Sequence, residues 1–142
     1  IADGEPVLGV IYVPVKDILY YAEKGKGSFK QIGNAEPVRI FATQKDKPEV
    51  AIVSRSHANQ ALQDWLTEKG ITKSIDAGSS LKFCLVAEGQ ADVYPRTGPT
   101  MEWDVAAGDA IWRNAKAEGT NPSGITYNKE DLRNTEFVIG YV

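Results

Sequence analysis

The chain has 142 residues with 16 basic and 19 acidic side chains, a net charge of −3 at pH 7, and a size that suits one domain or part of a larger protein. Charges of one sign are not gathered into blocks, so the sequence shows no electrostatic footprint for nucleic acid but allows a local basic site for a small anion. Because no apolar run approaches the roughly 20 residues of a membrane span, we expect no transmembrane segment, while association with a membrane surface stays open.

Residues 1–45 predict a series of antiparallel strands. The first apolar, β-branched run ends at Pro14, a short turn follows, and glycines separate the later runs. The expected strands cover residues 7–13, 18–22, 28–31 and 38–42. We expect them to belong to the N-terminal sheet of a larger protein, with a domain boundary in the polar stretch before Pro48.

Residues 46–142 change to an alternation of strands and helices, which predicts a second domain. Apolar residues at i, i+3, i+4, i+7 and i+8 predict a first helix that Ser56 would cap and Gly70 would end. We expect helices at residues 58–66, 80–88 and 103–111, and strands at 50–53, 71–75, 91–94, 125–127 and 137–142. Pro95 would end the third of these strands. The single cysteine, Cys84, would be a buried thiol, which indicates a reducing, cytoplasmic compartment.

The fold class that these elements predict is α/β, or α+β overall. Antiparallel hairpin strands are followed by a mainly parallel sheet with flanking helices, because strands that alternate with helices form βαβ units. Ligands of such sheets bind beyond the carboxyl ends of the strands, where the helices begin. Three stretches meet this rule: residues 54–57, 78–82 and 103–104.

Four residues near the predicted helix starts are candidates for an anion site. Gly78 and Ser79 combine a small residue, a hydroxyl and free N–H groups, although an ordinary helix cap also explains them. Lys82 lies in the first helical turn, where a cation is unfavourable, so it is either a solvated lysine or one that faces an anionic ligand. His57, the only histidine, is either structural or part of the same pocket.

Arg96 and Asp104 are the remaining candidates. Arg96 follows a strand, and its planar guanidinium suits phosphate, although a surface arginine is the alternative. Asp104 is either an N-cap or a ligand of a hard cation such as Mg²⁺. We expect the preceding residue, Trp103, to anchor the start of the helix. Glu102 and Asp109 should point in other directions, with Asp109 a solvated helix residue, so a metal at Asp104 needs carboxylates from elsewhere.

Several motifs resemble those of the inositol monophosphatase superfamily of Mg²⁺-dependent, lithium-sensitive phosphatases. Residues 103–108 stand where the family has its Trp-Asp-x-Ala-Ala-Gly signature. Stretches similar to the bisphosphate nucleotidase branch of this family are residues 54–57, 78–84, 94–100 and the Tyr-Asn-Lys of 127–129. Residues 9–14 and 19–22 also resemble a hairpin of the family. The resemblance covers nearly the whole chain and implies a sugar-phosphatase-like fold.

The resemblance implies a role for each candidate residue. Asp104 would bind Mg²⁺ and touch the substrate. The nucleotide and its 5′-phosphate would be bound by a subsite that consists of His57, Gly78, Ser79, Lys82 and Arg96. The implied reaction is the hydrolysis of 3′-phosphoadenosine 5′-phosphate to AMP and phosphate in sulfur assimilation. The implied partner is thus a small-molecule nucleotide bisphosphate, and a homodimer stays open.

Two family motifs are not in this sequence: a Glu-Glu segment and Asp-Pro-Ile/Leu-Asp-Gly-Thr, which carry the other metal carboxylates. We therefore expect the chain to correspond to the C-terminal half of a longer enzyme and to be inactive, or nearly so, alone. Two alternatives stay open. One is an inositol- or sugar-phosphate phosphatase of the same superfamily, in which a carboxylate replaces Arg96. The other is a non-catalytic fragment that binds nucleotides or anions.

Overall fold

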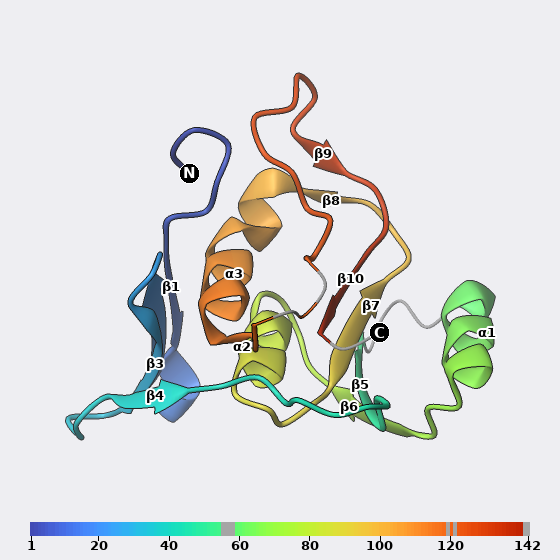
Figure 1. Ribbon diagram of the computed structural model, residues 1–142, viewed down its shortest axis with the longest axis horizontal. Coiled ribbons are helices and arrows are strands. Elements are labelled where there is room, and N and C mark those ends of the chain that lie inside the picture. Colours follow the sequence, from blue (N-terminus) through green and yellow to red (C-terminus); the bar gives the residue numbers. More distant parts are fainter. Residues whose placement is uncertain (55–58, 119, 121, 141–142) are drawn as a thin grey trace.

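The computed structural model of the protein describes residues 1–54, 59–118, 120 and 122–140. Its elements are stacked in the order of a first sheet, helices α3 and α2, a second sheet and helix α1 (Figure 1). The strands are β1 (Leu8–Val13), β2 (Ile18–Glu23), β3 (Gly27–Ile32), β4 (Val38–Ile40), β5 (Val50–Val53), β6 (Lys73–Asp76), β7 (Val93–Arg96), β8 (Thr100–Met101), β9 (Arg133–Asn134) and β10 (Phe137–Gly140). The helices are α1 (Gln60–Lys69), α2 (Leu81–Ala87) and α3 (Glu102–Ala115), and a 3₁₀ turn covers Pro14–Lys16.

The first sheet joins β1 to β4 in chain order, and each neighbouring pair is antiparallel, as predicted. Its inner face packs against α3. Gly9 makes this contact possible, because a Cβ atom at that position would lie 2.3 Å from the Ala107 carbonyl oxygen. The outer face of the sheet exposes large apolar side chains on β1: Leu8, Val10 and Tyr12.

The second sheet has the strand order β10–β7–β5–β6. Strands β6 and β7 run parallel to β5, and β10 runs antiparallel to β7, so the predicted mainly parallel sheet is confirmed with an antiparallel edge strand added. Helix α2 covers the face toward the first sheet, and α1 covers the other face through Leu62 and Leu66. The division into domains at residues 1–45 and 46–142 stays a prediction.

Two strand predictions are wrong. Pro95 does not end its strand but lies inside β7, paired with Val138 on β10. Strand β7 pairs with β5 at Val93, before Pro95. Proline lacks a backbone N–H, but at this position no hydrogen bond to β5 is lost. Ile125 and Tyr127 belong to a loop and not to a strand, and their side chains are buried in the core. The Ile125 carbonyl accepts a hydrogen bond from the Arg113 side chain instead of one from a neighbouring strand.

The predicted cap of the first helix is also wrong. Helix α1 begins at Gln60, and the side chain of Asn59 caps it by accepting the Leu62 N–H at 2.9 Å. Ser56, the predicted cap, lies outside the described residues. The prediction for the other end is confirmed, because Gly70 follows the helix with a left-handed φ of 67°, which glycine adopts readily.

Helix α3 lies between the first sheet and α2, and its packing requires another glycine. A Cβ atom at Gly108 would lie 2.6 Å from the Phe83 ring, so only glycine allows α2 and α3 to approach this closely. Trp112 of α3 and Cys84 of α2 are completely buried in the same core. None of the described helices is long and apolar enough to cross a membrane.

A buried ion pair links the first sheet to α2. Glu88 accepts the Tyr20 hydroxyl at 2.8 Å and pairs with the Lys30 ammonium at 2.5 Å. All three side chains are largely removed from water, so each polar group depends on the others for its hydrogen bonds.

We expect Glu88→Gln to lower the free energy of unfolding by about 1–3 kcal/mol, because it removes the charge that satisfies Lys30 and Tyr20 in a buried place. Urea unfolding of the chain measures this change. Glu23→Gln is the matched control, since Glu23 forms an exposed ion pair with Lys26, and it should cost less than about 0.5 kcal/mol. Equal effects of the two substitutions would contradict the prediction.

Candidate functional site

The starts of α2 and α3 are joined by a side-chain hydrogen bond. Ser80 is the residue before α2, and its hydroxyl donates to the Asp104 carbonyl oxygen at 3.2 Å rather than capping its own helix. Gly78 and Ser79 precede it on the surface, and Ser79 has a left-handed φ of 51°. A Cβ atom at Gly78 would meet nothing within 4 Å, so the space above this turn is open.

Lys82 is not a solvated surface lysine, because only 5% of it is exposed. Its ammonium nitrogen lies 5.2 Å from the centre of the Tyr94 ring, a cation–π contact. Within the described residues this ammonium has no carboxylate partner and no hydrogen bond. Burial, and then the charge of Arg96, lower the pKa of Lys82, so the ligand-free site holds its cation at a cost.

Arg96 ends β7 beside the same tyrosine ring. Its guanidinium donates to the Gly98 carbonyl oxygen at 3.1 Å and to the Pro99 carbonyl oxygen at 3.2 Å, contacts that orient it without neutralising its charge. Arg96 is partly buried and has no ion pair among the described residues. Two cations therefore approach Tyr94, and no described carboxylate balances them.

A small hollow of about 60 Å³ lies next to Arg96 and extends to the chain on both sides of residues 55–58. It is lined by Ser54, Asn59, Leu62 and the segment from Tyr94 to Gly98. His57, which was predicted for this site, lies outside the described residues. The neighbours of His57 in the chain are therefore placed at the hollow, while its own role stays a prediction.

Asp104 is the third residue of α3 and not its N-cap. One carboxylate oxygen accepts the Met101 N–H at 2.9 Å, and Met101 is the residue before the helix. The side chain is exposed and lines an open hollow together with Pro99, strand β8, Asp131 and the first residue of β9, Arg133. The second carboxylate oxygen has no hydrogen bond among the described residues and is open to a ligand.

Glu102 and Asp109 are bonded to partners away from Asp104, as predicted, but one expectation about them is wrong. Asp109 is 0% exposed rather than solvated, because Arg113 and the Tyr127 hydroxyl bind it at 2.9 and 2.7 Å. Glu102 is buried as well and pairs with Lys129 at 2.8 Å. The hydrogen bond from Lys129 is the main reason why the pKa of Glu102 is lowered.

The expectation for Trp103 is also wrong. Its side chain is 66% exposed and does not anchor the helix start. Glu102 holds that place, because its side chain is turned into the protein and bonded to the loop that contains Lys129. The sequence does not predict this role of Glu102. Residues 127–129 form a recognisable motif, but only the fold brings them next to α3.

A bound metal needs more ligands than Asp104. Among the described residues, no group of three or more His, Cys, Asp or Glu side chains is arranged to hold a metal ion. Asp104 itself fits as one ligand, because it is an exposed carboxylate with one uncommitted oxygen, and hard cations prefer oxygen. The site as described therefore consists of one carboxylate and an unbalanced pair of cations.

These features define an α/β protein with a candidate site at the starts of α2 and α3, where two cations face a small anion that could bind. Residues 1–140 match the model of the inositol monophosphatase family, and the chain belongs to that family. The fold and the resemblance inferred from the sequence are thus confirmed.

The chain is similar to bisphosphate nucleotidases of enteric bacteria. It is 46% identical over 111 residues to 3′(2′),5′-bisphosphate nucleotidase CysQ of Salmonella typhimurium. The matched region covers 78% of this chain and 44% of that protein. It is 44% identical over 108 residues to CysQ of Escherichia coli K12, with 76% and 43% covered. The chain therefore spans less than half the length of these relatives.

Solved structures show the same likeness. The crystal structure of CysQ from Bacteroides thetaiotaomicron, a bacterial member of the inositol monophosphatase family, has a TM-score of 0.82 and 40% identity, over 98% of this chain and 59% of that chain. Staphylococcal IMPase-II has a TM-score of 0.73 at 20% identity, over 97% of this chain and 53% of that one, which shows a shared fold alone.

We expect Lys82→Met to raise the free energy of unfolding of the ligand-free chain by about 1 kcal/mol, because it replaces an unpaired buried cation by an apolar side chain of similar length. Lys30→Met is the matched control. It leaves Glu88 buried without its cation and should lower the free energy of unfolding by about 1–3 kcal/mol. A loss of stability in both variants, measured by urea unfolding, would mean that Lys82 is a structural residue.

The stability gap between wild type and Lys82→Met should close as the pH rises toward 10.5. The pKa of Lys82 in the folded chain is lowered from 10.5, so below the folded pKa the wild type bears the whole cost of a buried charge. Between the two pKa values the unfolded chain binds more protons, and the stability of the wild type therefore rises with pH relative to the variant. Urea midpoints from pH 7 to 10.5 measure the gap, and a constant or widening gap would contradict the assignment.

Proposed function

We propose that the natural polypeptide that contains this chain is a Mg²⁺-dependent 3′(2′),5′-bisphosphate nucleotidase. It would hydrolyse 3′-phosphoadenosine 5′-phosphate to AMP and phosphate, a step of sulfur assimilation. One observation supports this substrate above the others: Lys82 is buried beside Arg96 without a described carboxylate to balance either charge. The names of the bacterial relatives described above agree with it.

The cation pair would receive the phosphate that stays on the nucleotide. Arg96 has a planar guanidinium that can bind phosphate through two parallel hydrogen bonds, and Lys82 adds a second positive charge on a side chain that is largely buried. Gly78 and Ser79 would supply backbone N–H groups and a hydroxyl at the edge of the same site, and His57 would complete it. An inositol or sugar substrate presents hydroxyls instead, for which an acceptor such as a carboxylate is the suitable partner.

Asp104 would hold the catalytic end of the site. A bound Mg²⁺ activates a water and stabilises the negative charge of the leaving oxygen in phosphoryl transfer. Asp104 would contribute one oxygen, kept in place by the Met101 N–H, and the other ligands would come from outside the described residues. Most of the catalytic effect of the protein groups in such reactions is positioning and charge neutralisation.

The setting that we propose is the cytoplasm. Cys84 is completely buried and free, and burial raises the pKa of its thiol, so it has the character of a structural cysteine in a reducing environment. A homodimer stays a prediction, which the sedimentation of the natural polypeptide would test.

The test of the proposed function is phosphate release by the natural polypeptide with Mg²⁺. Wild type should release phosphate rapidly from 3′-phosphoadenosine 5′-phosphate, with inhibition by lithium. Arg96→Glu should lower kcat/KM for this substrate about 100-fold or more, because a carboxylate replaces a group that pairs with phosphate, while inositol monophosphate should be affected far less.

Arg39→Glu is the matched control, since Arg39 is an exposed arginine that lies over Phe41, and both substrates should keep their rates. No release from the bisphosphate by wild type would end the proposal and favour a sugar-phosphate substrate. Equal losses on both substrates in Arg96→Glu would show that Arg96 does not select for the second phosphate. The 142 residues alone should release phosphate at a small fraction of the full rate at most.

A further inference from the structure

The segment Tyr127–Lys129 has no part in the proposed function. It is nevertheless bonded to α3 at two residues, one before Asp104 and one after it. Its first contact is with Glu102, the first residue of α3. The Glu102 carboxylate accepts the N–H of Asn128 at 2.9 Å and the N–H of Lys129 at 3.0 Å, and it pairs with the Lys129 ammonium at 2.8 Å. Three donors from two consecutive residues thus hold one buried carboxylate.

The backbone of Glu102 is held by the same loop. Its N–H is one of the groups that a helix start leaves without an intrahelical partner, and it donates to the Leu132 carbonyl oxygen at 2.8 Å. The acidic side chain also stands at the positive end of the helix dipole, where a negative charge is favourable. Both the side chain and the main chain of the first residue of α3 therefore depend on residues 128–132.

A second contact lies two turns further along α3. The Tyr127 hydroxyl donates to Asp109 at 2.7 Å, and the carboxylate of Asp109 also pairs with Arg113. The Arg113 guanidinium continues to the Ile125 carbonyl oxygen at 2.9 Å. Asp104 stands between Glu102 and Asp109 in the helix, so the segment binds α3 on both sides of it.

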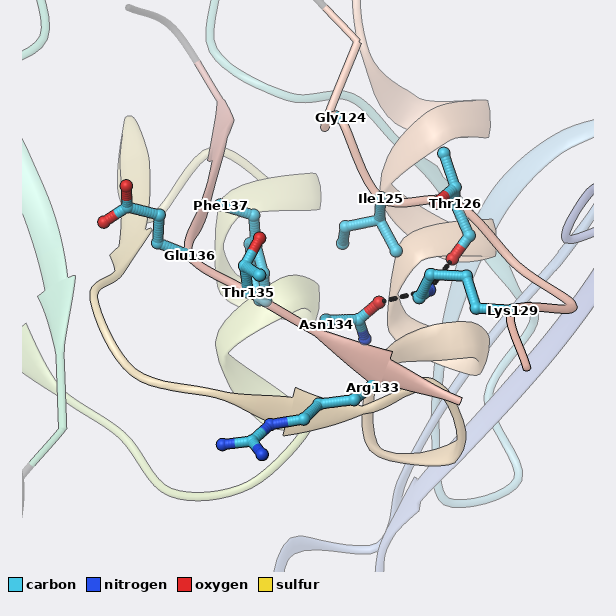
Figure 2. A pocket seen from close by; sticks show the side chains of 9 residues that line it. All are labelled: Gly124, Ile125, Thr126, Lys129, Arg133, Asn134, Thr135, Glu136 and Phe137. Atoms are coloured by element: carbon cyan, nitrogen blue, oxygen red, sulfur yellow. Dashed lines mark hydrogen bonds between the residues drawn. The ribbon is translucent and has the colours of Figure 1, made fainter. Parts of the chain in front are cut away.

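Lys129 connects α3 to the strands that lead into it. Its ammonium group donates to the Thr126 carbonyl oxygen and, at 2.9 Å, to the side-chain oxygen of Asn134 (Figure 2). Asn134 belongs to β9, which pairs with β8, and β8 ends at the residue before α3. Figure 2 shows Lys129 joined to Thr126 and to Asn134 at the wall of a small pocket, where it links the loop to β9.

Asp104 has few contacts of its own. Its side chain is exposed, and within the described residues the only group that orients it is the Met101 N–H. The place of this carboxylate therefore follows the place of the first turn of α3, which the partly buried Glu102–Lys129 pair holds. Small displacements of a group that touches the reacting atoms are costly, because the reacting geometry tolerates only fractions of an ångström.

We propose that Glu102 and Lys129 are positioning residues for Asp104. They act through the first turn of α3 and touch neither nucleotide nor metal. The inference rests on the proposed function, since it assigns Asp104 to the reaction. It differs from a purely structural role in one respect: loosening the pair should impair turnover and metal binding at Asp104 while the nucleotide subsite at Lys82 and Arg96 is kept.

The experiment compares Lys129→Met with wild type in the natural polypeptide. We expect kcat for 3′-phosphoadenosine 5′-phosphate to fall about 10–100-fold, the range found when groups that orient a metal ligand are removed. The affinity for Mn²⁺, a cation that takes the same oxygen ligands, should fall by about 10-fold or more in a titration followed by electron paramagnetic resonance. KM should change little, and Lys129→Arg, which keeps charge and donors, should recover most of the loss.

Lys45→Met is the matched control. Lys45 is a half-exposed lysine that pairs with a buried carboxylate, Asp92, at 3.3 Å. Its replacement should therefore cost about as much stability as that of Lys129, but Lys45 is far from α3 in the chain. We expect this variant to be destabilised without any change of kcat or Mn²⁺ affinity. If Lys129→Met loses no more activity and metal affinity than Lys45→Met does, the positioning role is wrong.

Two results separate this inference from the proposed function. Wild type without activity on the bisphosphate would end the proposed function, while the Mn²⁺ titrations of the three variants would still test the effect of Lys129 on Asp104. If Lys129→Met does not fold, Asn134→Ala removes one of the three acceptors around the ammonium. It should lower kcat and Mn²⁺ affinity several-fold, and wild-type values for both would overturn the inference.

Discussion

The structure depends on the close approach of α3 to two neighbours at once. Glycine at position 9 lets β1 lie against the backbone of α3, and glycine at position 108 lets the Phe83 ring of α2 lie against its other side. Any Cβ atom at either place would overlap the facing atoms at less than 3 Å. This packing lets α3 hold the first sheet on one side and α2 on the other, so the starts of the two helices come together and Ser80 meets Asp104.

The same crowding explains how charges are distributed inside the molecule. A carboxylate removed from water needs donors, and the buried acids have them: Glu88 binds Lys30 and Tyr20, and Glu102 binds Lys129 and two backbone N–H groups. Lys82 differs from these acids, because its ammonium lies against an aromatic ring with a second cation nearby and has no described carboxylate beside it. A protein that tolerates such an imbalance gains binding energy when an anion neutralises it, which is the physical basis of the proposed nucleotidase function.

Sequence reasoning succeeded where a local pattern decides the structure. Apolar runs separated by proline and glycine placed the four strands of the first sheet, and helical periodicity with a terminal glycine placed α1 and its end at Gly70. It failed where distant partners decide. Asp109 looks like a solvated helix residue until Tyr127 and Arg113 reach it, and Trp103 looks like an anchor although Glu102 holds the helix start. Pro95 reads as a strand end because the sequence does not show that β5 stops pairing before it.

The sequence alone determined the family, the order of most elements and the identity of the candidate residues, because motifs such as Trp103–Gly108 combine a required backbone with required chemistry over a few positions. Only the tertiary structure decided which charges are balanced. Whether Lys82 is solvated or buried, and whether Tyr127–Lys129 is a surface loop or a support for Asp104, depends on what the other elements place around them. Charge balance in a protein interior arises from groups far apart in the chain, which no local pattern records.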